Sequence, residues 1–187
     1  MVRAFLKWIP LAIAITGLCG LIYATVQQNY RQSLNDPQVQ MAEDGAMALA
    51  SGASPAEIVP RGVLINADKS LTSFIAVYDS KGTPLEASAT IGGQPPKPPQ
   101  GIFNAARDNR GKDTSVANEN RVSWQPSRDT RIALVVKYVP ERQQFVAAGR
   151  NMREVEIREA QLSRMIELGW LVIMVSSLIA LWAISKW

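Results

Sequence analysis

The chain has 187 residues, of which 47% are apolar, and its 20 lysines and arginines exceed its 16 acidic residues by a net charge of +4. The basic residues are scattered, so the sequence lacks the basic patch typical of nucleic-acid-binding proteins. Histidine is absent, which removes the commonest metal ligand and the commonest general acid or base. The single cysteine, Cys19, excludes an internal disulfide and a cysteine-based metal site. We therefore expect no metal, no cofactor and no Ser-His-Asp catalysis.

Two uncharged runs lie near the ends of the chain, at residues 8–26 and 168–185. A helix of about 20 apolar residues crosses a bilayer core about 30 Å thick, so each run is long enough to span a membrane. Tryptophans and a tyrosine near the ends of the runs are typical of membrane interfaces. The sequence predicts two transmembrane helices, with a buried core helix as the alternative for either run and a cleaved signal peptide as the alternative for the first.

The orientation of the chain in the membrane is predicted from the first span and from the length of the loop between the two spans. The first span usually sets the orientation, and a loop longer than about 60 residues is translocated largely regardless of its charge. We expect a multi-pass protein of the cell (inner) membrane with cytoplasmic termini and residues 27–165 outside the cytoplasm. The predicted parts are a tail and first transmembrane helix (1–26), an extracytoplasmic domain (27–150), and an exit helix that continues into the second transmembrane helix (151–187).

The segment between the runs predicts one α+β domain. In chain order we expect a helix from Asp36-Pro37 to about residue 51, a β-hairpin of 73–79 and 85–91, a stiff proline-rich loop at 92–100, a short helix at 101–110, and strands at 121–124, 130–139 and 144–149. This order predicts a five-stranded antiparallel sheet with helices on one side. In the strand at 130–139, Ile132 and Leu134 should face the helices, while Arg131 and Lys137 share a mixed face that forms a pocket or is solvated.

Four segments taken together carry a resemblance. They read FIAVYDSKGTPLEASATIGG, PPKPPQGIFNAARDN, RVSWQPSRDTRIALVVKYV and FVAAGRNMREVEIREAQL. In this order they resemble the extracytoplasmic sensor region of two-span bacterial sensor histidine kinases, and the closest fits are Gly149-Arg150 with Arg153-Glu154-Val155-Glu156, and Gln125-Pro126 with Arg131. The resemblance implies a PAS-like or Cache-like fold in a dimeric two-component signalling protein. The kinase activity is not carried over, because the chain has no histidine to accept phosphate and no glycine-rich nucleotide loop.

Two sets of residues are candidates for function. Arginine forks match carboxylates, so an anion-accepting ligand site is one interpretation of Arg107, Trp124, Arg131, Lys137 and Tyr138. The alternative is that these groups only solvate an exposed sheet face. The candidate signalling residues of the exit helix are Arg150, Arg153, Glu154, Val155 and Leu162. Their apolar members belong to a stripe that either forms a dimer or packs on the helix at 36–51.

The function that we predict is sensing without catalysis. A ligand or partner at the extracytoplasmic domain would shift the exit helix, and a separate kinase or membrane partner would respond. The lipid bilayer and a second copy of the chain are the other expected partners. A structural or assembly subunit of a cell-envelope complex is the main alternative, followed by an enzyme of the outer leaflet and by a split kinase whose output half is a separate protein.

Overall fold

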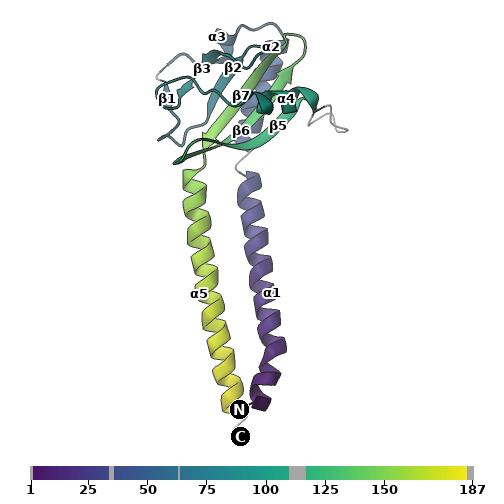
Figure 1. Ribbon diagram of the computed structural model, residues 1–187, viewed down its shortest axis with the longest axis vertical. Helices are drawn as coiled ribbons and strands as arrows, with labels where there is room; N and C mark the ends of the chain where they lie inside the picture. Colours follow the sequence, from purple (N-terminus) through teal and green to yellow (C-terminus); the bar gives the residue numbers. More distant parts are fainter. Residues whose placement is uncertain (1, 34–35, 63, 110–116, 185–187) are drawn as a thin grey trace. The chain divides into compact units, whose positions relative to one another are not determined.

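The computed structural model describes residues 2–33, 36–62, 64–109 and 117–184 (Figure 1). The chain forms two compact units. One contains Met1–Gln32 and Val155–Trp187, and the other contains Ser33–Glu154. We call the first unit the helix pair and the second unit the domain, and describe each by itself.

The helix pair consists of α1 (Val2–Ser33) and α5 (Arg153–Ile184). Both helices are long and apolar enough to cross a membrane, which suggests a membrane protein. Side-chain hydrogen bonds between described residues join them. Trp8 Nε1 donates to Ser177 Oγ over 2.9 Å, and Trp170 Nε1 donates to Thr16 Oγ1 over 3.0 Å. Helix α5 is continuous from Arg153 to Ile184.

The domain is built on a five-stranded antiparallel sheet, which confirms the predicted α+β class. Its strands are β2 (Phe74–Tyr78), β3 (Pro84–Ala87), β5 (Glu119–Ser127), β6 (Thr130–Val139) and β7 (Gln144–Asn151). They lie in the order β3-β2-β7-β6-β5, so the first long strand pairs with the last in the centre of the sheet. Strand β5 forms one edge and pairs only with β6 among the described strands.

The helices cover both faces of the sheet, and the prediction of helices on one side is wrong. Leu49 of α2 (Asp36–Ala50) packs with Ile75 and Val77 of β2. Phe103 of α4 (Gln100–Asp108) packs instead with the alternate residues of that strand, Phe74, Ala76 and Tyr78. Because successive strand residues point to opposite faces, α2 and α4 lie on opposite sides, as Figure 1 shows. The physical reason is that β2, β6 and β7 are apolar on both faces, and both faces therefore have to be covered.

Helix α2 lies unusually close to the sheet at Gly45. A Cβ atom added there would lie 2.9 Å from Ile75 Cδ1 and 3.0 Å from Val146 Cγ1, so a larger residue would require these side chains to shift. On the predicted mixed face of β6, Ala133 and Val135 are both buried, and Val135 packs with Ala42 of α2. That part of the face is therefore core, and not the pocket or solvated surface expected from the sequence.

A second, small sheet was not predicted. The hairpin arm expected at 85–91 leaves the main sheet at Ser88, whose hydroxyl accepts the N–H of Ile75 and donates to its carbonyl. The chain then continues as β4 (Ala89–Thr90), which pairs in parallel with β1 (Ile65–Asn66). The short helix α3 (Pro55–Ile58) precedes β1, and Ser54 and Glu57 form a capping box at its start.

The turn between β2 and β3 depends on a carboxylate. Asp79 Oδ1 accepts the N–H of Thr83 over 2.7 Å and the N–H of Lys81 over 2.9 Å. These hydrogen bonds, that from Thr83 most strongly, favour the charged carboxylate and lower the pKa of Asp79 below its ordinary value. Gly82 completes the turn with φ of +77°, a conformation that glycine adopts without strain.

This turn predicts an acid dependence of stability. Because the pKa of Asp79 is lower in the folded chain, its contribution to stability is present above the unfolded pKa of about 4 and is lost as the pH falls through the folded value. We expect Asp79→Ala to lower the free energy of unfolding at pH 6 but to reduce its further fall between pH 5 and pH 3, measured by urea unfolding. Ser80→Ala, in the same turn, is the control and should keep the wild-type pH dependence. If Asp79→Ala kept the wild-type acid dependence, Asp79 would not be a source of that dependence.

Candidate functional site

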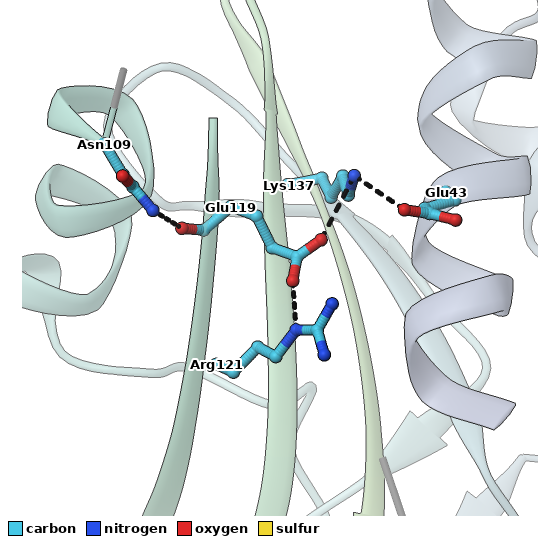
Figure 2. Close-up of polar contacts among 5 residues, drawn as sticks. All are labelled: Glu43, Asn109, Glu119, Arg121 and Lys137. Carbon is cyan, nitrogen blue, oxygen red and sulfur yellow. Dashed lines mark hydrogen bonds and ion pairs between the residues drawn. The ribbon is translucent and has the colours of Figure 1, made fainter. Parts of the chain in front are cut away.

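The domain contains one fully buried carboxylate among its described residues. Glu119 is the first residue of β5 and lies directly opposite Lys137 of β6 in the strand register. Its side chain is 0% exposed, and its Oε2 lies 3.1 Å from Lys137 Nζ. Arg121 Nε donates to its Oε1 from two residues farther along β5 (Figure 2). A buried charge is costly unless it is paired and hydrogen-bonded. Both oxygens of Glu119 are ion-paired here, and Oε1 also accepts a hydrogen bond, whereas Oε2 accepts none from the described residues.

Lys137 connects this buried carboxylate to helix α2. Its Nζ donates to Oε1 of Glu43 over 3.0 Å, so one ammonium lies between a glutamate of the sheet and a glutamate of the helix (Figure 2). The Lys137 side chain is 14% exposed and that of Glu43 is 40% exposed. The three side chains therefore become progressively more exposed from Glu119 through Lys137 to Glu43. We call Glu43, Glu119, Arg121 and Lys137 the charged cluster.

The backbone of Glu119 is bound from the opposite face of the sheet. Asn109, immediately after α4, donates from Nδ2 to the carbonyl of Glu119 over 2.6 Å (Figure 2). Asn109 also receives the N–H of Asn118 on its own carbonyl. One residue of the edge strand is thus connected to elements that cover the two different faces of the sheet.

A cleft of about 320 Å³ adjoins the charged cluster, and we call it the α2 cleft. Its walls are the second half of α2 and the end of β6 with the turn that follows. The lining residues are Glu43, Ala46, Met47, Ala50, Lys137, Tyr138, Val139, Pro140 and Glu141. Two members of the charged cluster, Glu43 and Lys137, therefore face the cleft. Most of the remaining lining is apolar, which is typical of small-molecule sites.

On the other face of the sheet, Arg107 is held by aromatic rings. Its guanidinium lies 5.4 Å from the ring centre of Tyr138 and 5.2 Å from that of Phe145. Its Nη2 donates to the carbonyl of Ser80 over 2.7 Å, which attaches α4 to the β2–β3 turn. These contacts fix Arg107 as a packing group between α4 and the sheet.

Of the five residues predicted to bind a ligand, the structure brings together only Arg107 and Tyr138, whose ring lies 5.4 Å from the guanidinium on the α4 face. The ammonium of Lys137 is on the opposite face, at the α2 cleft. Trp124 lies opposite Ile132 in the register, at the far end of β5, and packs against the core on the α4 side. Arg131 is exposed near the start of β6, where its carbonyl accepts the N–H of Met152.

The glutamates of the charged cluster were missed by the sequence analysis. A lysine within the apolar run VVKYV was the available signal, because a half-buried ammonium needs a carboxylate partner. Identifying Glu119 as that partner requires the register of β5 on β6, and identifying Glu43 requires knowing which face α2 covers.

The predicted signalling residues begin where the last strand ends. Arg150 Nε donates to the carbonyl of Leu71 over 2.8 Å, and buried Asn151 donates to the carbonyl of Ala67 over 2.8 Å. Asn151 Oδ1 accepts the N–H of Arg153, the first residue of α5, over 2.9 Å. Among the other residues of this set, Glu154 is half-buried, Val155 is buried and Leu162 is half-buried.

Neither a family model, nor a curated protein, nor a solved structure matches the chain. Within the part of the chain that the structure describes, no group of three or more acidic or cysteine side chains is arranged to hold a metal ion. The functional argument therefore starts from the charged cluster and the α2 cleft.

Proposed function

We propose that the chain is a two-span membrane protein whose domain lies outside the cytoplasm and binds a small ligand in the α2 cleft, without a catalytic step. The observation that carries this proposal is the position of Lys137, which lines the cleft and at the same time joins buried Glu119 to Glu43 of α2. A ligand in the cleft would therefore meet the charged group that connects this helix to the sheet. The two long apolar helices support the membrane placement.

The charges of the cleft favour a ligand with a positive group on a small apolar body. Glu43 and Glu141 both offer carboxylates at the cleft, and Glu43 is partly exposed. The ammonium of Lys137 already lies between two carboxylates, so an anion would have to displace one of them. Ala46, Met47 and Val139 provide the apolar contact. An amine or a guanidinium compound fits this lining better than the anion suggested by the sequence.

The same contacts suggest how binding would be transmitted. A cationic ligand competes with Lys137 for Glu43, so its binding favours conformations in which α2 is held less tightly. Strand β6, which carries Lys137, pairs along its length with β7, and β7 ends at Asn151, whose side chain accepts the N–H of the first residue of α5. We infer that the exit helix passes the change to a separate partner protein. The sheet order, with the first long strand between the second and the last, supports the PAS-like fold that the resemblance implies.

Binding of an organic cation tests the ligand proposal. We expect agmatine to bind the full chain in detergent micelles, measured by isothermal titration calorimetry, and succinate not to bind. Glu43→Gln should weaken agmatine binding about tenfold or more, because a charge-assisted hydrogen bond is lost. Glu86→Gln, at an exposed glutamate of β3, is the matched control and should bind as the wild type does. Equal binding by Glu43→Gln and wild type, or the absence of agmatine binding, would contradict the proposal.

The placement of the domain is tested separately with intact cells. Protease added outside should cleave the domain while the helix pair stays in the membrane fraction. A domain that is protected in intact cells and cleaved only after lysis would overturn the extracytoplasmic placement.

A further inference from the structure

A second cleft, of about 510 Å³, lies within the helix pair between α1 and α5. Its lining includes Thr16, Gly20 and Tyr23 of α1 and Ser163, Glu167 and Trp170 of α5. We call it the interhelix cleft. The hydrogen bond from Trp170 Nε1 to Thr16 Oγ1 joins the two helices at one end of it. Besides apolar surface, the cleft thus offers hydroxyl groups and one carboxylate.

The cleft lies where α5 changes from charged to apolar. Glu167 directly precedes the uncharged run that begins at Leu168, and Arg164 lies about one turn before it. The opposite wall, on α1, is still within its uncharged run at Tyr23. In a helix pair that spans a bilayer, the level at which charges begin is that of the lipid headgroups, where tryptophan and tyrosine also concentrate. Trp170 and Tyr23 both line the cleft at this level.

The charges next to the cleft match a zwitterionic headgroup. Glu167 lines the cleft, and its Oε1 receives a long hydrogen bond of 3.4 Å from Ser163 Oγ. Arg164 is exposed and lies three positions before Glu167, so the two side chains project from neighbouring parts of the helix surface. A carboxylate suits an ammonium group, and an arginine suits a phosphate. Beyond the cleft, Leu168, Leu171 and Val172 are exposed apolar residues that acyl chains would contact.

We propose that the interhelix cleft binds the headgroup of an ethanolamine phospholipid. Its primary ammonium donates to the carboxylate of Glu167 and to the hydroxyl groups beside it, and its phosphate lies next to Arg164. A choline headgroup has no N–H to donate, and a glycerol headgroup has no positive charge, so neither forms this pair of contacts. The proposal rests on the membrane placement of the helix pair and is independent of ligand binding in the domain.

Native mass spectrometry of the full chain in micelles tests this inference. We add dioleoyl phosphatidylethanolamine, phosphatidylcholine or phosphatidylglycerol in turn, and expect one ethanolamine lipid to be retained about tenfold more than the others, as the loss of one charge-assisted hydrogen bond implies. Glu167→Gln should reduce its retention to that of phosphatidylcholine. Glu159→Gln, about two turns earlier on α5 and outside the lining, is the matched control and should retain the lipid.

A second variant keeps every charge in place. Gly20 lines the cleft, and a Cβ added there meets nothing within 4 Å, so Gly20→Leu fills the space without a clash at its Cβ. It should abolish the preference for the ethanolamine lipid. Equal retention of the three lipids by the wild type, or a preference that survives both Glu167→Gln and Gly20→Leu, overturns the inference. Extraction of the chain from membranes by alkaline carbonate would instead overturn the membrane placement, which distinguishes the two failures.

Discussion

Replacement of Lys137 by methionine is expected to lower the free energy of unfolding by about 3 kcal/mol, because it leaves the carboxylate of Glu119 buried with only one of its two cations. Arg121, the remaining partner, is 43% exposed and compensates only in part. The loss also frees Glu43 of α2 from its bond to the sheet. Urea unfolding of the full chain in detergent, followed by circular dichroism, measures the effect.

The double variant Lys137→Met with Glu119→Leu separates charge from packing. Since it removes the buried charge together with its partner, it should be clearly more stable than Lys137→Met alone. Glu86→Gln, on an exposed position of β3, should unfold with the wild type. A Lys137→Met chain that is as stable as this control would show that the charged cluster does not hold α2 on the sheet.

Replacement of Phe103 by alanine is expected to cost about 4 kcal/mol of stability, at the upper end of the effects of single core substitutions. Phe103 is fully buried, and its ring lies 5.0 Å from that of Tyr78 and 5.1 Å from that of Phe145. It also closes over Gly82, where a Cβ would lie 2.8 Å from the ring. Truncation therefore leaves a cavity beneath α4 and removes two aromatic contacts.

Asn104, the next residue of α4, is exposed and provides the control. Asn104→Ala should change the free energy of unfolding by less than about 0.5 kcal/mol, whereas Phe103→Leu should lie between the control and Phe103→Ala. Thermal unfolding of the three variants in the same detergent makes the comparison. If Phe103→Ala and Asn104→Ala melted together, α4 would not be part of the domain core.

The sequence predicted the main strands well because their patterns are strong. The assignment of Ile132 and Leu134 to one face of β6, and of Arg131 and Lys137 to the other, is correct. The prediction that the helices lie on one side of the sheet was wrong. The segment FIAVY at Phe74–Tyr78 could have indicated helices on both sides, because five consecutive apolar residues are typical of a strand that is buried on both faces. The small sheet of β1 and β4 was missed because strands of two residues have no periodicity to detect.

The candidate site was predictable only in part. Lys137 stands out in the sequence because it interrupts an apolar strand. Its partners Glu43 and Glu119 lie 94 and 18 positions away along the chain, and they meet it only through tertiary packing. Arg107 looked equally suitable for a ligand, but the structure places its guanidinium on two aromatic rings. Local patterns identify charged residues in a strand, whereas their partners depend on register and on the choice of face.

The pairing of Glu119 with Lys137 also has a consequence for how β5 finds its place during folding. The strand alternates between half-buried and exposed residues, so sliding it by two positions would preserve the alternation. Such a slip in one direction sets Arg121 against Lys137, two like charges, and leaves Glu119 opposite the apolar Val139. A slip in the other direction sets Glu119 against Val135. The ion pair thus penalises misaligned edge pairing that apolar burial alone would tolerate.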